Sequence, residues 1–163
     1  MDEGLDFATE KGSLPRTDGI LNLSPGEAQA YLARGAVMVD IREAYETNFR
    51  VFDIDEVLYL PWTRFGSGMG SLPHDRPLVI ADAAGIYCRE AARLLTEAGY
   101  SNIAKLSGGM IDWDSWHFPV RKDEDFELRG ECACKMKTRH GGSPLIDKNS
   151  RANYESTDRS ISN

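Results

Sequence analysis

Short apolar runs alternate along the chain with segments of helical periodicity. Almost continuously apolar runs occur at residues 37–41, 57–60, 78–80 and 103–106. Runs of this length without polar alternation are typical of strands that are buried on both faces of a sheet. Such strands, separated by helices, predict a small three-layer α/β domain with a mainly parallel central sheet and helices on both faces.

The first helix has clear signals at both ends. Ser24 is a predicted N-cap, Pro25 suits the first helical position, and Glu27 completes a capping box. Gly35 can adopt the left-handed conformation that follows a helix, so we expect the helix to end there.

Two further helices are expected in the second half of the domain. Residues 88–98 place five small or apolar side chains on one face at helical spacing: Cys88, Ala91, Ala92, Leu95 and Ala98. Gly99 follows as the cap. After a turn at Gly108-Gly109, residues 110–113 are expected to form a short helix that carries Trp113 as an aromatic anchor.

Polar segments flank the predicted domain, which we place at residues 20–120. Residues 1–19 are interrupted by glycine and proline and are expected to be a mobile N-terminal lead-in. Residues 121–163 are charged and polar without apolar periodicity, so we expect a largely disordered tail.

Composition argues against several classes of partner. The formal net charge of -7 disfavours general attraction to nucleic acid or to an anionic membrane. No stretch approaches the roughly 18 apolar residues of a membrane helix, and the acidic N-terminus differs from a signal peptide. Three cysteines, Cys88, Cys132 and Cys134, do not form a disulfide framework. We therefore expect a cytoplasmic protein without a cofactor.

The loop after the strand at residues 78–80 is the candidate site, because sites in parallel sheets form at the carboxyl ends of strands. A strand–loop–helix turn directs several backbone N–H groups inward and adds the positive end of a helix dipole. The sequence thus predicts a cradle for an anion, formed by Asp82, Ala83, Ala84, Gly85, Ile86, Tyr87 and Cys88.

Several short motifs occur in a recognisable order. Residues 39–43 read Val-Asp-Ile-Arg-Glu and precede Tyr45-Glu46, which is similar to a D-x-R-E…E segment. Residues 106–110 and Trp113 are similar to a closing L-x-G-G-x…W segment. Together, over about residues 23 to 120, these motifs resemble the rhodanese-like family, the fold of the sulfurtransferases.

The resemblance implies an active loop of the pattern C-x-x-G-x-R-S, whose cysteine carries a thiolate and then a persulfide. Aligned on Gly85, this chain has Asp82 at the nucleophile position, Tyr87 for the arginine and Cys88 for the serine. A carboxylate cannot hold a transferable sulfur, so the usual transfer through the loop is not expected. Phosphatase activity, also known on this fold, needs the same cysteine and arginine and is not expected either.

Two interpretations of Asp82 stay open. Its carboxylate fills the cradle as an internal anion, or it merely caps the following helix, since helix N-termini favour aspartate. Cys88 continues the inner face of its helix and is expected to be structural, because free cysteine is usually buried. Asp40 and Arg42 are expected to form an internal pair that orders the strand end near the loop.

Two segments depart from the family pattern elsewhere. Residues 49–55 replace its G-H-I-x-G-A segment, and the glycine-rich stretch at residues 66–70 replaces a helix. The glycines predict a flexible flap beside the loop. They do not indicate a nucleotide site, because no helix signal follows them.

Cys132 and Cys134 are the remaining candidates for thiol chemistry. Basic residues surround them, which lowers the pKa of thiols. The pair could carry a persulfide, close a strained disulfide or begin a metal site with His140, although zinc normally takes four ligands. Two exposed thiols in a basic tail are the simpler interpretation, and no metal site is expected.

These features predict a rhodanese-like module that is inactive in the usual sulfur transfer and binds an unknown protein partner or a small anion. The alternative is sulfur or persulfide transfer through Cys132 or Cys134, with Cys88 a less favoured nucleophile. A structural accessory to another enzyme has the same sequence signature as the first possibility.

Overall fold

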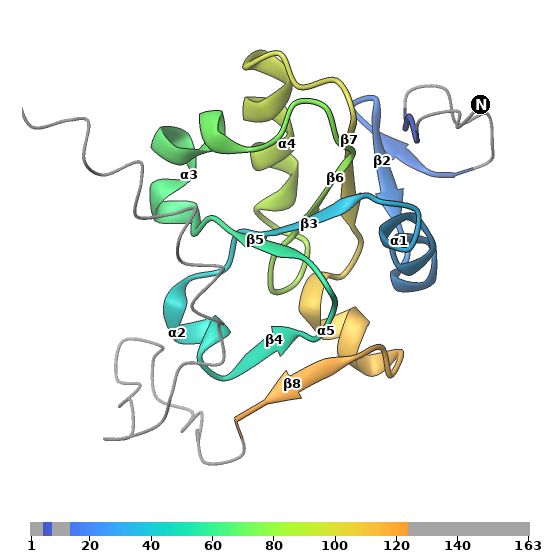
Figure 1. Cartoon of the computed structure of the whole chain (residues 1–163), viewed down its shortest axis with the longest axis vertical. Helices are drawn as coiled ribbons and strands as arrows, with labels where there is room; N and C mark the ends of the chain where they lie inside the picture. Colours follow the sequence, from blue (N-terminus) through green and yellow to red (C-terminus); the bar gives the residue numbers. More distant parts are fainter. Residues whose placement is uncertain (1–4, 8–13, 124–163) are drawn as a thin grey trace, which may run out of the picture.

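A computed structural model of the chain describes residues 5–7 and 14–123 (Figure 1). Its central six-stranded sheet has the order β1-β2-β7-β6-β3-β5. The strands are β1 (Arg16–Thr17), β2 (Ile20–Leu23), β3 (Val37–Asp40), β5 (Val57–Tyr59), β6 (Leu78–Ala81) and β7 (Ile103–Leu106). Only the pairing of β1 with β2 is antiparallel within this sheet. A separate antiparallel ribbon joins β4 (Arg50–Phe52) to β8 (Val120–Lys122).

Helices cover both faces of the sheet. They are α1 (Pro25–Leu32), α2 (Ala44–Thr47), α3 (Trp62–Gly68) with the 3-10 turn η1 (Met69–Ser71), α4 (Cys88–Glu97) and α5 (Gly109–Ser115). Residues of α1 and α5 pack into one hydrophobic cluster, and residues of α3 and α4 pack into the other. The predicted α/β class with a mainly parallel sheet is therefore confirmed. Within the described part of the chain, no helix has the length and apolar character to cross a membrane.

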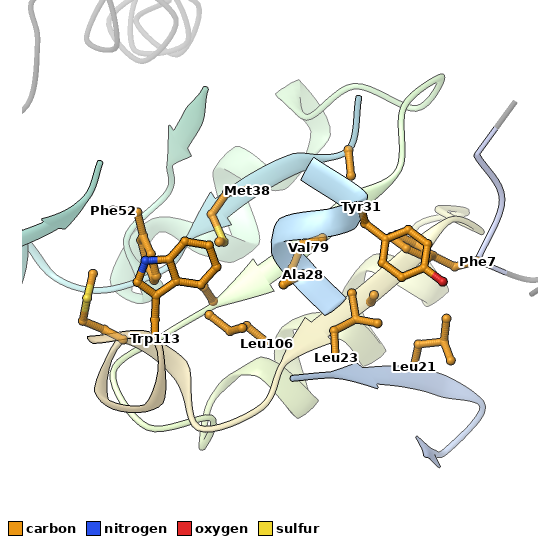
Figure 2. Packing of buried hydrophobic residues seen from close by; sticks show 14 residues of the cluster. Phe7, Leu21, Leu23, Ala28, Tyr31, Met38, Phe52, Val79, Leu106 and Trp113 are labelled. Atoms are coloured by element: carbon orange, nitrogen blue, oxygen red, sulfur yellow. The ribbon is translucent and has the colours of Figure 1, made fainter. Parts of the chain in front are cut away.

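The fully buried Trp113 anchors the first cluster, as Figure 2 shows. Its ring packs edge-on against Phe52, with centroids 5.5 Å apart. Its Nε1 donates a hydrogen bond of 3.0 Å to the carbonyl of Pro119, so that the polar atom of this buried side chain is satisfied. The core thus joins α5 to the β4–β8 ribbon.

Both ends of the described chain extend the packed unit beyond residues 20–120. Phe7 is 1% exposed and packs edge-on against Tyr31, with ring centroids 4.9 Å apart. This differs from the mobile lead-in expected over residues 1–19, because an aromatic side chain there finds a place in the core. Strand β8 likewise carries pairing into the predicted tail. The exact domain limits remain predictions, and residues 124–163 lie outside the described residues.

The glycine-rich stretch forms α3 and η1, so the prediction of a flexible flap is wrong. Thr63 donates from its N–H (2.9 Å) and its hydroxyl (3.1 Å) to the carboxylate of Glu43. Phe65 is 1% exposed. A Cβ on Gly68 would lie 2.5 Å from Cδ1 of Leu60, so glycine permits this close packing. These contacts outweigh the low helix propensity of glycine.

Candidate functional site

The chain leaves β6 at Ala81 and turns through residues 82–87 into α4. Gly85 occupies the middle of this loop with a φ of +83°, a conformation that side chains rarely adopt. A Cβ on Gly85 would lie 3.3 Å from the backbone nitrogen of Gly108. The loop thus needs glycine here for its conformation and for its close approach to the turn before α5.

The start of α5 holds the loop from outside. The N–H of Met110 donates to the carbonyl of Asp82 (2.9 Å), and the N–H of Ile111 donates to the carbonyl of Ala83 (3.1 Å). Gly109 has a φ of +56°, and a Cβ there would lie 2.3 Å from the Asp82 carbonyl oxygen. Two loop carbonyls therefore face α5, while the N–H groups that follow them need another acceptor.

The Asp82 side chain supplies that acceptor. Its Oδ1 accepts the N–H groups of Ala84 (3.1 Å) and Gly85. Its Oδ2 accepts the N–H groups of Tyr87 (2.6 Å) and Cys88 (3.3 Å), at the start of α4. Asp82 is only 3% exposed. The carboxyl group thus accepts N–H groups of its own loop and of the start of α4, an arrangement compatible with both interpretations of Asp82.

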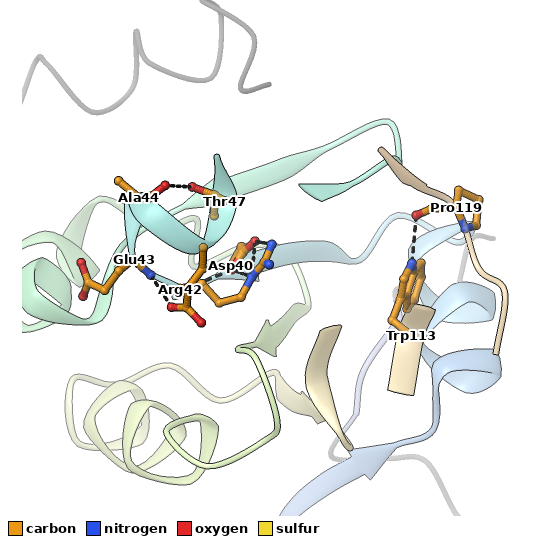
Figure 3. A network of polar contacts seen from close by, with 8 residues as sticks. Asp40, Arg42, Glu43, Ala44, Thr47, Trp113 and Pro119 are labelled. Carbon is orange, nitrogen blue, oxygen red and sulfur yellow. Dashed lines mark hydrogen bonds and ion pairs between the residues drawn. The ribbon is translucent and has the colours of Figure 1, made fainter. Parts of the chain in front are cut away.

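Asp40 and Arg42 form a buried ion pair beside the loop strand, drawn in Figure 3. Nε of Arg42 donates to Oδ1 of Asp40 (2.9 Å) and Nη2 donates to Oδ2 (2.6 Å). The guanidinium also lies over the Phe52 ring, 5.2 Å from its centroid. Burial lowers the pKa of Arg42, but the charge and hydrogen bonds of Asp40 raise it overall. This cation is therefore already neutralised inside the protein.

Glu46 brings another carboxyl group near the same place. Its Oε2 accepts the N–H of Glu43 (3.0 Å) in a capping box at the start of α2. Burial raises the pKa of Glu46, and the charges of Asp40 and Asp82 raise it further, against the Glu43 hydrogen bond and Arg42. In the sequence, Glu46 belongs to the D-x-R-E…E segment but was not predicted to be a residue of the site. Its position in the D-x-R-E…E segment was the available signal for a side chain near the loop.

Cys88 points into the core. It is 1% exposed, and its Sγ donates to the carbonyl of Ile80 at 3.4 Å. Burial raises the pKa of this thiol well above its ordinary value, and the charge of Asp82 raises it further. These contacts support a structural role for Cys88.

Cys88 should therefore react slowly with iodoacetamide in the folded protein. We expect alkylation at least about 100-fold slower than in the chain unfolded in urea, because the thiolate is the reactive species and is both buried and disfavoured. Timed quenching and peptide mass spectrometry give the two rates. Equal rates in both states would contradict the burial of this thiol.

Two hydrophobic side chains next to the cradle face solvent. Ile86 is 73% exposed and Tyr87 is 52% exposed. The Tyr87 ring meets Trp62 of α3, with centroids 5.4 Å apart, and Trp62 in turn stacks on Phe65.

Among the described residues, no group of three potential ligands is placed to hold a metal ion. Cys132, Cys134 and His140 lie outside these residues.

A parallel α/β domain whose loop after a central strand directs several N–H groups inward belongs to a broad class of folds, and comparisons with known proteins narrow that class. No family model matches the chain. The thiosulfate sulfurtransferase GlpE of Pseudomonas savastanoi pv. phaseolicola is 30% identical over 91 residues, which cover 56% of this chain and 84% of that protein. The uncharacterized protein YibN of Escherichia coli is 29% identical over 108 residues, 64% of this chain and 74% of that protein. The chain belongs to the rhodanese-like family.

Solved structures agree on the fold. A rhodanese-related protein from Thermoplasma volcanium superposes with a TM-score of 0.57 at 20% identity, over 63% of this chain and 98% of that chain. The thiosulfate sulfurtransferase of Pseudomonas aeruginosa superposes with a TM-score of 0.54 at 21% identity, over 85% of this chain and 24% of that chain.

Proposed function

We propose that this rhodanese-like domain does not transfer sulfur through its loop and acts instead as a binding or regulatory module. In this proposal Asp82 takes the position of the family's nucleophilic cysteine. The main support is the Asp82 carboxylate, which accepts four N–H groups of its own loop. Those donors would otherwise stabilise a thiolate or a persulfide, and a carboxylate offers no sulfur to transfer.

The charges around the loop also disfavour an anionic sulfur donor such as thiosulfate. The loop residues 83–87 contribute no cationic side chain. Arg42 is bound to Asp40, and the carboxyl groups of Asp82 and Glu46 lie nearby. An incoming anion would meet like charges in a partly buried place, where screening by water is weak.

A protein is the partner that these features favour over a small anion. The internal carboxylate already satisfies the cradle, so an external anion would have to displace it. Ile86 and Tyr87, by contrast, present exposed hydrophobic surface beside Trp62. Aromatic and aliphatic side chains of this kind are common anchors in protein interfaces.

An assay of the full chain with thiosulfate and cyanide tests the proposal. We expect turnover equal to a blank without enzyme, and no persulfide on Cys88 in peptide mass spectra, because Asp82 cannot accept sulfur. Turnover that disappears on Cys132→Ser or Cys134→Ser would contradict the proposal and support the alternative, sulfur transfer through the tail. Turnover lost only in Cys88→Ser would also contradict it.

A further inference from the structure

A second feature of the molecule is an open groove between α4 and the turn that joins β1 to β2. Its volume is about 580 Å³. Lys105 of β7 lines it together with residues of α4, and two isoleucines, Ile20 and Ile86, add apolar surface. Ile86 belongs to the loop after β6, so the groove borders the cradle without including Asp82.

Lys105 is unusual for a lysine in its burial and its lack of a partner. Lys105 is 7% exposed and pairs in register with Ile80, so its side chain rises on the face that α4 covers. Within residues 5–7 and 14–123, no hydrogen bond or ion pair involves its ammonium group. Nζ of Lys105 is not among the fully buried, unpartnered side-chain atoms of the described residues, whereas Nε of Arg50 is. A lysine nitrogen without a partner that is not fully buried must have some exposure. The Lys105 ammonium therefore reaches the groove.

The other charged side chains of the groove satisfy one another. Nε of Arg89 lies 2.8 Å from Oδ2 of Asp18. Arg93 pairs with Glu90 at 2.6 Å and also with Glu97. Lys105 is thus the one cation among the described lining residues with no carboxylate at ion-pair distance, and among carboxylates only the more distant charge of Asp18 favours its ammonium form. An ammonium on a largely buried side chain, open only toward the groove, gains from a partner of opposite charge, so this position favours an anionic ligand.

We propose that the groove binds a small carboxylate with a short aliphatic chain. The ligand carboxylate would accept hydrogen bonds from the Lys105 ammonium, and its aliphatic part would lie against Ile20 and Ile86. A single negative charge suits the groove better than a polyanion, because Asp18, Glu90 and Glu97 stand on its walls. This site is separate from Asp82, so it does not depend on whether the loop transfers sulfur.

Sodium butyrate is a suitable probe, added to the ¹⁵N-labelled full chain at constant ionic strength with chloride as the balancing anion. We expect saturable amide shifts at Ile86, Arg89 and Lys105, with a Kd on the order of millimolar for so small a ligand. The Lys105→Met variant keeps the apolar stem but removes the ammonium, and should weaken binding at least about tenfold. The matched variant Lys122→Met removes a lysine from strand β8, outside the groove, and should bind as the parent does.

The proposal would be overturned if the amide shifts did not saturate with butyrate, or if Lys105→Met and the parent bound butyrate with equal affinity. Tighter binding of inorganic phosphate than of butyrate would also overturn it, since phosphate lacks the aliphatic part. If Lys105→Met does not fold, acetylation of the parent decides the matter. Butyrate should then slow the acetylation of Lys105 several-fold and leave Lys122 unaffected, and absence of this protection would contradict the site.

Discussion

Replacing Asp82 with cysteine should give a thiol whose pKa lies at least about one unit below the ordinary 8.5 and which thiosulfate converts into a persulfide. The four N–H groups that now bind the carboxylate, together with the start of α4, should stabilise the thiolate. The thiolate would attack the sulfane sulfur of thiosulfate and release sulfite. Alkylation rate against pH gives the pKa, and peptide mass spectrometry detects the added sulfur atom.

A cysteine elsewhere in the same loop is the matched control. Ala84 is exposed on this loop, so the thiol of Ala84→Cys should keep an ordinary pKa and gain no sulfur. Turnover of Asp82→Cys should stay low even when a persulfide forms, because the loop supplies no cation for the donor. An ordinary or inaccessible thiol at position 82 would show that the loop does not act as an anion cradle, and the internal-anion interpretation of Asp82 would have to be dropped.

Replacing Arg42 with methionine should lower the free energy of unfolding by about 3–5 kcal/mol. The variant leaves Asp40, which is fully buried, without the three side-chain hydrogen bonds and the positive charge that compensate its carboxylate. An uncompensated buried charge is among the largest destabilising changes that one substitution causes. Urea unfolding followed by circular dichroism measures the loss.

Two controls separate this effect from a general loss of charge. Arg76 pairs with Glu56 at the surface, where the side chains are 37% and 48% exposed, so Arg76→Met should cost less than about 1 kcal/mol. The double variant Asp40→Leu, Arg42→Met removes both charges and should recover most of the stability that the single variant loses. A loss below about 1 kcal/mol in Arg42→Met would contradict the importance of this pair.

The central part of the fold was predictable, because its signals are local. The apolar runs mark β3, β5, β6 and β7, and the capping box of Ser24 and Glu27 marks the start of α1. Strands β1, β4 and β8 have two or three residues each, which is too short for a periodic pattern. Strand β1 forms by pairing with its neighbour β2, and β4 and β8 form only because these two distant segments meet. The glycines of α3 also misled prediction, because contacts such as the close packing of Gly68 against Leu60 are not visible in the local sequence.

The place of the candidate loop between a strand and a helix was predictable, whereas its geometry was not. Asp82 stands out in the sequence only through the predicted alignment on Gly85, which sets it at the position of the family's cysteine. Its four hydrogen bonds, however, depend on a loop shape that α5 holds from outside, through residues 109–111. Lys105 carries no sequence signal beyond its place in a strand. Its burial and its opening to a groove follow from the packing of α4 and the β1–β2 turn around it.

The hydrogen bonds from α5 to the loop affect which loop residues can be substituted without a change in the shape of the loop. The main-chain amides of Met110 and Ile111 hold the loop from outside, and the Asp82 carboxylate binds the loop's own amides inside. The side chains of Ala83, Ala84 and Ile86 make no hydrogen bond to this arrangement, so these positions can change while the N–H groups keep their inward direction. On this view, a change at residue 82 alone adds or removes the atom that could carry sulfur, whereas turnover also needs a cation that residues 83–87 do not supply.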